Sequence, residues 1–183
     1  MFLYQDFPLQ VFTQGDFLIS SDPGKIDIGM VHRYLAYESY WASDITREMV
    51  ERFLKYSLCY GVYSRATVAQ GVLLGQQHHA MGSDIQIGFA RVISDFTTFA
   101  YLADVFILAS YRGQGLGKWL LSCILAHDEL KELRKWTLNT KDAHGLYKRF
   151  GFQVTPDPQT HMTWRIARRA SSAEVGKRRR QDI

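Results

Sequence analysis

The chain has 183 residues, of which 46% are hydrophobic and 22% are charged, as is typical of a globular protein. No apolar run reaches the ~18 residues that cross a bilayer, and residues 1–10 lack the basic start and apolar segment of a secretory signal. These features exclude a membrane-spanning protein, and we expect a cytoplasmic protein without a membrane partner. Cys59 and Cys123 have no second cysteine or histidine at metal-ligand spacing, so we expect reduced, buried thiols and no metal.

The net charge of +4 is a property of the C-terminus. Residues 165–183 carry seven basic and two acidic side chains, whereas the rest of the chain carries 15 basic and 16 acidic ones. Residues 167–183 contain almost no large apolar side chain, so burial would not offset the entropy lost on ordering, and we expect a disordered tail. The Lys-Arg-Arg-Arg run at 177–180 is compatible with a nuclear localisation signal. The nearly neutral charge of the rest of the chain argues against a nucleic-acid partner.

In the first half of the chain, apolar spacing and turn residues place two helices and three strands. A strand over 17–21 ends in the turn signal Ser-Asp-Pro-Gly, and a helix over about 27–37 follows. Thr46 is a candidate N-cap for a second helix, whose apolar residues recur at helical spacing. Residues 58–64 and 85–93 predict neighbouring antiparallel strands, and 65–84, rich in Gly, Gln and His, predicts a long hairpin loop between them.

The second half of the chain predicts a parallel pair of strands. A strand over 99–108, an apolar helix over 116–126 and a strand over 136–140 follow one another as in a right-handed βαβ crossover. A ligand is expected beyond the carboxyl ends of such strands. A short helix follows, with Asp142 as its N-cap and Gly151 at the left-handed C′ position. Finally, residues 162–166 predict a closing strand. The expected fold class is α/β, with a mixed sheet that is antiparallel at first and parallel in this one pair.

A glycine-rich segment lies between the strand that ends near Leu108 and the helix that begins near Leu116. Residues 111–117 read Tyr-Arg-Gly-Gln-Gly-Leu-Gly, and three glycines at alternate positions leave successive N–H groups unshielded at a helix N-terminus, where the dipole favours anions. We interpret the segment as a pyrophosphate cradle, with a purely structural tight turn as the alternative. The spacing G-x-G-x-G excludes the dinucleotide fingerprint, and Lys118 followed by Trp119 excludes a P-loop.

Two motifs resemble those of a known family. Residues 103–117 resemble the acetyl-CoA signature of the GNAT N-acetyltransferase superfamily, in which Arg112, Gly115 and Gly117 fill the pattern Arg/Gln-x-x-Gly-x-Gly/Ala after a strand. Residues 146–152, Leu-Tyr-Lys-Arg-Phe-Gly-Phe, resemble the family's second signature, a tyrosine helix that ends in Gly-Phe. The resemblance covers about residues 16–166 and departs from the family in the insertion and the basic tail. It implies a three-layer GNAT-like domain over 1–166, with an insertion over about 65–84 and a central, mostly antiparallel sheet.

The family resemblance also implies a reaction. Acetyl-CoA would serve as co-substrate, and its acetyl group would move to the primary amine of a small molecule or peptide by direct attack in a ternary complex. A backbone N–H at Leu108 or beside it would stabilise the charge on the carbonyl oxygen. The residues implied to contact acetyl-CoA are Leu108, Arg112, Gly113, Gln114, Gly115, Leu116, Gly117 and Lys118. The alternative is a non-catalytic CoA-binding sensor of the same fold, and homodimer formation is left open.

The two proton-transfer residues differ in how clearly the sequence marks them. Tyr147 matches the family's general acid, which would protonate the departing thiolate, with simple aromatic packing as the alternative. On a regular strand, Asp104 would share one face with Leu102, Phe106 and Leu108. A carboxylate among apolar neighbours needs a partner or a special role, so we expect Asp104 as the catalytic base. A buried ion pair with Arg91, with water as the proton carrier, is the alternative.

In this family, the first helices and the loop between them roof the acceptor groove. The corresponding residues of this chain are rich in aromatic side chains, so we expect Tyr34, Tyr40 and Trp41 to line an acceptor pocket and Glu38 to pair with an ammonium group. The alternative is ordinary aromatic packing in the core and on the surface.

Overall fold

The computed structural model describes residues 7–65, 84–156 and 158–164. By its internal contacts the chain divides into two units, Met1–Phe152 and Gln153–Ile183. The predicted domain boundary at 166 lies outside the described residues. Residues 66–83 of the predicted insertion and the whole of the predicted basic tail lie outside the described residues. No helix in the described residues is long and apolar enough to cross a membrane.

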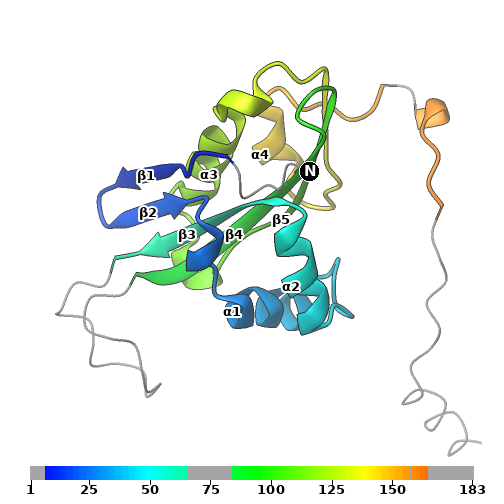
Figure 1. The fold of residues 1–183 in the computed structure, drawn as a ribbon. Helices are drawn as coiled ribbons and strands as arrows, with labels where there is room; N and C mark the ends of the chain where they lie inside the picture. The colour runs from blue at the N-terminus through cyan, green and yellow to red at the C-terminus, as the bar shows by residue number, and fades with distance from the viewer. Residues whose placement is uncertain (1–6, 66–83, 157, 165–183) are drawn as a thin grey trace, which may run out of the picture. The chain divides into compact units, whose positions relative to one another are not determined.

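A single six-stranded sheet, shown in Figure 1, organises the first unit. Its spatial order follows the chain, and every neighbouring pair is antiparallel except the last, β5 and β6, which are parallel. The strands are β1 Val11–Gln14, β2 Phe17–Ser20, β3 Leu58–Ser64, β4 Ile85–Ser94, β5 Phe99–Ile107 and β6 Lys135–Thr137. The predicted parallel pairing of β5 with β6 and the predicted antiparallel pairing of β3 with β4 are therefore confirmed.

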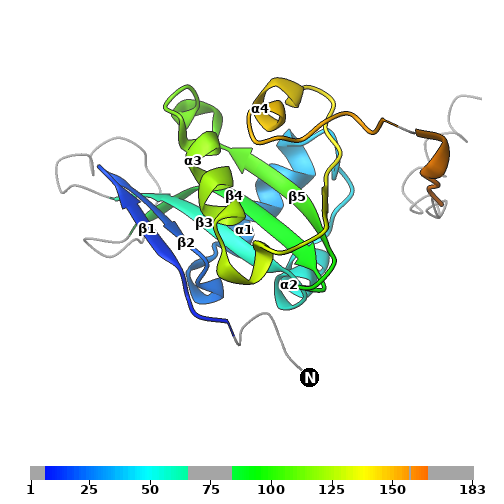
Figure 2. The same cartoon turned by 90° about the horizontal axis from the view of Figure 1, so that it is seen from above.

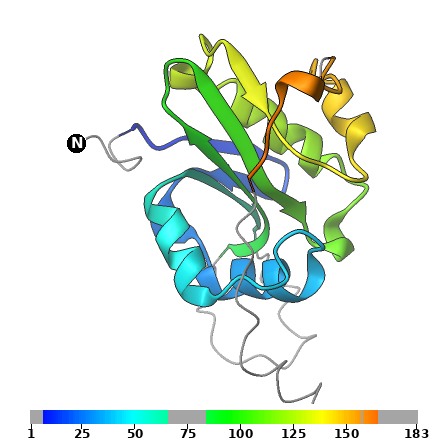
Figure 3. The same ribbon diagram turned by 90° about the vertical axis from the view of Figure 1, so that its right-hand side faces the viewer.

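Helices cover both faces of the sheet. They are α1 Ile28–Arg33, continued by one π-helical turn at Tyr34–Glu38, α2 Arg47–Lys55, α3 Leu116–Leu125 and α4 His144–Lys148. Figures 2 and 3 show α1 and α2 on one side of the sheet and α3 on the other. Each side has its own apolar core: Leu120 and Ile124 of α3 pack with Tyr60 of β3, whereas Val31 and Val50 belong to the opposite core. The predicted three-layer α/β fold is confirmed.

Local sequence explains how the helices begin and end. Thr46 accepts a hydrogen bond from the Met49 N–H at 3.3 Å and caps α2 as predicted. Gly151, at φ 85°, ends α4 in a Schellman motif, since the Phe152 N–H donates to the Tyr147 carbonyl and the Gly151 N–H to the Lys148 carbonyl. The C′ position predicted for Gly151 is therefore confirmed.

The prediction that Asp142 caps α4 is wrong. The helix begins at His144, one residue later than an Asp142 cap requires, and its N-cap position is Ala143, without a side-chain cap. The Thr140 hydroxyl accepts the Ala143 N–H at 3.0 Å in its place. The carboxylate of Asp142 is therefore not used for capping.

Three strand predictions also need correction. Strand β1 was missed because its alternation is weak, with Val11 58% exposed. Strand β6 is shorter and earlier than the predicted 136–140. Residues 162–164 form no strand, and Met162 and Trp164 are 92% and 88% exposed. Apolar alternation makes a strand only where a neighbouring strand accepts its hydrogen bonds, and in the described residues the sheet ends at β6.

Candidate active site

Strands β5 and β6 pair over a short distance only. Their register runs from Phe99 opposite Lys135 to Tyr101 opposite Thr137, whereas β5 continues to Ile107. Residues 102–107 of β5 therefore present a backbone edge on the side away from β4 that β6 does not cover, which we call the open edge of β5. It lies toward the carboxyl ends of the parallel strands, where the sequence predicts the ligand.

The backbone of Ile107, not that of Leu108, faces this open edge. The Leu108 N–H donates to the Ile87 carbonyl of β4 at 2.8 Å. Because successive residues of a strand direct their backbone groups to opposite edges, the N–H of Ile107 points toward the open edge. The backbone donor predicted at Leu108 or beside it is therefore best matched by Ile107, since the Leu108 N–H is used in a hydrogen bond of the sheet.

The glycine-rich turn leads from the end of β5 into α3. Gly113 and Gly115 both have φ 81°, in the left-handed region, and Gly115 is the N-cap of α3. The first helical hydrogen bond is donated by Trp119 to the Gly115 carbonyl, at 3.0 Å. The N–H groups of Leu116, Gly117 and Lys118 precede that bond and have no partner within the helix.

Gly117 leaves space beside the turn for an external group. Its backbone is helical, so no left-handed φ explains a glycine there, and a Cβ at this position would meet no described atom within 4 Å. By contrast, a Cβ on Gly88 would come within 2.6 Å of Ile107 Cδ1. A glycine in a helix costs about 0.5–1 kcal/mol relative to alanine, so helix stability does not favour Gly117. The missing Cβ leaves space at the start of α3 into which a diphosphate bound by the N–H groups of this turn would fit.

The other residues of this turn that are predicted to contact acetyl-CoA differ in what their side chains do. The Arg112 side chain donates from Nε to the Ile107 carbonyl at 2.9 Å and from Nη2 to the Tyr34 hydroxyl at 3.0 Å, so it braces the turn against β5 and the π-helical turn. Leu116 is buried and offers only its N–H, whereas Gln114 and Lys118 are exposed.

Tyr147 lies on α4, where it is 9% exposed and packs edge-on against Phe152 at a centroid distance of 5.9 Å. Burial, reinforced by the nearby Tyr40 and Asp142, raises the pKa of Tyr147 to about 12. Its hydroxyl therefore stays protonated at neutral pH and can give a proton to a leaving group. The packing predicted as the alternative is also present, and the two roles are compatible.

Asp104 occupies a break in the regularity of β5. Its φ is 53°, and the register with β4 skips from Phe106 opposite Phe89 to Ala103 opposite Arg91, so two residues oppose one in a β-bulge. The bulge reverses the alternation of faces. Leu102 packs in the core under α3, but Phe106 packs in the core under α1 and α2, so the prediction of one shared face is wrong.

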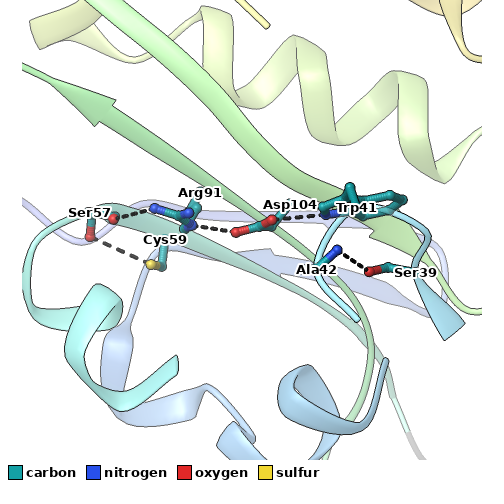
Figure 4. A network of polar contacts seen from close by, with 7 residues as sticks. All are labelled: Ser39, Trp41, Ala42, Ser57, Cys59, Arg91 and Asp104. Atoms are coloured by element: carbon teal, nitrogen blue, oxygen red, sulfur yellow. Dashed lines mark hydrogen bonds and ion pairs between the residues drawn. The ribbon is translucent and has the colours of Figure 1, made fainter. Parts of the chain in front are cut away.

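The Asp104 carboxylate lies between two donors, as Figure 4 shows. Oδ2 accepts Arg91 Nε at 2.5 Å, and Oδ1 accepts Trp41 Nε1 at 3.0 Å, with the side chain 8% exposed. Arg91 also donates to the Ser57 hydroxyl at 3.3 Å and lies 4.3 Å from the ring centre of Phe53. The ion pair considered as the alternative to a catalytic base is thus present.

Of the residues predicted to bind the acceptor, one lies in the core and the others lie on the surface. Tyr34 is buried, stacks on Phe106 at 3.7 Å between ring centres, and binds Arg112. It therefore fits the alternative of ordinary aromatic packing. Burial raises the pKa of Tyr34, and Arg112 opposes this rise. Tyr40 and Trp41 are 52% and 42% exposed, with ring centres 5.0 Å apart, and Glu38 is exposed.

Tyr40 and Trp41 together bridge the two diverging strands. Trp41 binds Asp104 of β5, as described above, and the Tyr40 hydroxyl accepts the Lys141 N–H at 2.9 Å in the segment after β6. The same hydroxyl lies 3.5 Å from Oδ1 of Asp142, to which it donates. Asp142 thus belongs to this group, and its only sequence signal was its place after the parallel strand. No group of three potential metal ligands occurs in the described parts of the chain.

Comparison with known proteins agrees with this geometry. Residues 75–154 match the family model described as "Acetyltransferase (GNAT) domain". A protein of Gibberella zeae named "Putative acetyltransferase FG08082" is 30% identical over 140 residues, which cover 75% of this chain and 79% of the relative.

Solved structures show the same fold. The structure of an acetyltransferase ascribed to the GNAT family, from Xanthomonas campestris pv. campestris, has a TM-score of 0.68 and 39% identity, covering 82% of this chain and 93% of that one. A GNAT family acetyltransferase of Elizabethkingia anophelis with acetyl-CoA bound has a TM-score of 0.50 and 16% identity, covering 78% and 79%, which shows the shared fold. The two motifs, the three-layer sheet and these similarities together establish that the chain belongs to the GNAT acetyltransferase family of acyltransferases.

Proposed function

We propose that the protein transfers the acetyl group of acetyl-CoA to the nitrogen of a primary amine, carried by a small molecule or a peptide. The observation that carries this proposal is the turn at 113–117, in which free helix N–H groups coincide with a helical glycine that the described protein does not require. The family membership adds the expectation of an acyl donor, and the open edge of β5 adds a backbone donor beside the end of the turn.

Acetyl-CoA would be held chiefly by the backbone. The N–H groups from Gly113 to Lys118 surround the N-terminus of α3, where the helix dipole favours the diphosphate, and the exposed Lys118 and Gln114 side chains can add to this. When bound, acetyl-CoA supplies a thioester-activated acetyl group. The Ile107 N–H, which points toward the open edge of β5, is the donor best placed to stabilise negative charge on the carbonyl oxygen, a contribution of about 10²–10³ in rate.

Proton transfer has to balance on both sides of the reaction. An amine with a pKa near ~10 is an ammonium ion at neutral pH and must lose a proton before its nitrogen can form the new bond to the acyl carbon. As the carbon–sulfur bond breaks, the Tyr147 hydroxyl gives its proton to the leaving sulfur. The nitrogen loses one proton before it attacks and a second as the amide forms. In this scheme the first proton leaves to water and the second returns through water to the Tyr147 oxygen, while Asp104 stays in its ion pair with Arg91.

The proposal is tested by incubating the full chain with acetyl-CoA and one member of each amine class. The panel contains a polyamine, an aliphatic amine, an amino acid, an aminoglycoside and a peptide with a free N-terminus. We expect release of free thiol that depends on at least one of these amines, with the acetylated amine identified by its mass.

Calorimetric titration with acetyl-CoA separates the alternatives. Tight binding without turnover of any amine would favour the CoA-binding sensor. A protein that does not bind acetyl-CoA at all would contradict the proposed cradle.

A further inference from the structure

Both oxygens of the Asp104 carboxylate accept hydrogen bonds from side chains of the protein. It lies on the bulge of β5 with one oxygen held by Arg91 and the other by Trp41, and its side chain is 8% exposed. Arg91 is itself 18% exposed and is held from behind by Ser57 and the ring of Phe53. Figure 4 shows Ser57, Arg91, Asp104 and Trp41 in one row, with Trp41 at one end and Ser57 at the other.

Trp41 is the end of this row that reaches solvent. Its indole N–H donates to Asp104, although the residue is 42% exposed. Its ring centre lies 5.0 Å from that of Tyr40 and 6.4 Å from that of Tyr34. Tyr40 is fixed in turn by the Lys141 N–H. Each of the two exposed rings is therefore hydrogen-bonded to one side of the interval between β5 and the segment after β6.

We propose that Trp41 is the specificity-determining residue for the acceptor and that Asp104 is a positioning residue, which acts by holding the indole of Trp41. An acceptor that arrives as an ammonium ion is attracted to the face of an aromatic ring within about 6 Å, and most strongly to indole. An indole whose N–H is bound by a buried carboxylate has lost its rotational freedom before the acceptor arrives, so less entropy is lost on binding. The inference rests on the proposed function, because it assigns the acceptor side of the same site.

The proposal separates two roles of Asp104 that predict different kinetics. A catalytic base changes kcat and its pH dependence when it is removed, by about 10²–10⁴. A positioning residue that acts through Trp41 changes the KM of the acceptor and leaves kcat, its pH profile and the KM of acetyl-CoA in place. Removal of Trp41 itself should then have the same effect as removal of Asp104.

The experiment uses the full chain and the variants Asp104→Ala, Trp41→Phe and their combination. Tyr37→Phe is the control, since Tyr37 is 80% exposed and belongs to the same π-helical turn. Initial rates are measured from pH 6 to 10 with saturating acetyl-CoA and the panel amine that the unaltered protein acetylates with the highest kcat/KM. In parallel, the indole N–H signals of the four tryptophans are recorded by NMR on protein labelled with ¹⁵N-tryptophan, without acetyl-CoA, and Trp41→Phe identifies the signal of Trp41.

We expect both single variants to raise the acceptor KM about tenfold, in the range of one cation–aromatic contact, with kcat changed less than about threefold. The acceptor KM of the double variant should be no higher than that of the more affected single variant, because both substitutions remove the same Trp41–Asp104 interaction. The indole signal of Trp41 should move in Asp104→Ala. Trp41→Phe leaves the Asp104–Arg91 ion pair intact, so it tests the proposal even where Asp104→Ala does not fold.

Three results would overturn the proposal. A hundredfold loss of kcat in Asp104→Ala with a changed pH profile, beside a normal Trp41→Phe, would make Asp104 the base. An unmoved indole signal would show that the Trp41–Asp104 hydrogen bond is absent in solution, and an unchanged acceptor KM in Trp41→Phe would remove Trp41 from the acceptor site. Failure of the proposed function looks different, since no amine would then be acetylated by any protein, the unaltered one included.

Discussion

The guanidinium of Arg112 and the hydroxyl of Tyr34 are 3.0 Å apart, and this hydrogen bond joins the glycine-rich turn to the helical segment beside the acceptor residues. Arg112 also binds the Ile107 carbonyl at the end of β5. One side chain thus holds three parts of the site in register: the turn, the open edge of β5 and the π-helical turn. The family motif marks Arg112 as a cofactor contact, whereas its side chain shows a bracing role.

Tyr34→Phe is expected to lower the free energy of unfolding by about 1–3 kcal/mol, because a hydrogen bond to a charged donor is lost while the ring stays stacked on Phe106. Urea denaturation of the full chain measures this change. Tyr37→Phe, at the exposed Tyr37, is the matched control and should lie within about 0.5 kcal/mol of the unaltered protein. An equally stable Tyr34→Phe variant would mean that the Arg112 bond contributes nothing to folding.

Gly117→Ala should have opposite effects on stability and on acetyl-CoA binding. The added Cβ meets no described atom within 4 Å and the backbone is helical, so the free energy of unfolding should rise by up to about 1 kcal/mol. The same methyl group occupies the surface proposed for the diphosphate and should weaken acetyl-CoA binding at least tenfold by calorimetry. Ser122→Ala, farther along α3, is the control for effects on the helix alone. Unchanged affinity in Gly117→Ala would place the diphosphate elsewhere.

Gly115→Asp tests the charge preference of the same turn. A carboxylate there would repel a diphosphate, and the left-handed φ of 81° disfavours most side chains, although Asp tolerates it better than others. We expect acetyl-CoA binding to be abolished while circular dichroism shows the fold retained. Normal affinity in a calorimetric titration would refute the cradle.

Tyr147→Phe should lower kcat by about 10²–10⁴ with nearly unchanged affinity for acetyl-CoA, because the ring and its packing on Phe152 remain while the proton is lost. Since burial raises the pKa of Tyr147 to about 12, the acid form persists above pH 10, where an ordinary tyrosine is half ionised. Activity of the unaltered protein should therefore show no loss from this group between pH 8 and 10. Full activity of Tyr147→Phe would remove Tyr147 from the mechanism.

His127 predicts the response of stability to mild acid. It is 2% exposed, accepts the Glu129 N–H at Nδ1, and burial lowers its pKa below the ordinary 6.5 although Glu129 and Asp128 oppose the shift. The unfolded chain therefore binds a proton at a higher pH than the folded one, so stability is complete above pH 6.5 and falls as the pH drops below it. Urea denaturation between pH 7.5 and 5.5 should show this fall, and His127→Asn should reduce it. An identical pH dependence in His127→Asn and in the exposed-site control His161→Asn would contradict the assignment.

Local features of the chain were predicted well because they depend on few residues. The turn at 113–117, the Thr46 cap and the Schellman end at Gly151 follow from side-chain size, φ preference and hydrogen bonding within one or two turns of chain. The parallel pairing of β5 and β6 followed from the strand–helix–strand order, which leaves one geometry open. The weak strand β1 was not predicted, because its hydrogen bonds to β2 define it and its sequence shows no clear apolar alternation.

The sequence by itself determined the α/β fold class, the family motifs, the glycine-rich turn and the helix that carries Tyr147, because each depends on contiguous residues at fixed spacing. Only the tertiary structure decided the surroundings of Asp104. A bulge of one extra residue reversed the faces of β5, and the partners Arg91 and Trp41 come from segments 13 and 63 residues away. The same holds for Asp142, which caps no helix and instead accepts a hydrogen bond from Tyr40. Contacts between distant segments depend on register and packing, and no local pattern of residues encodes them.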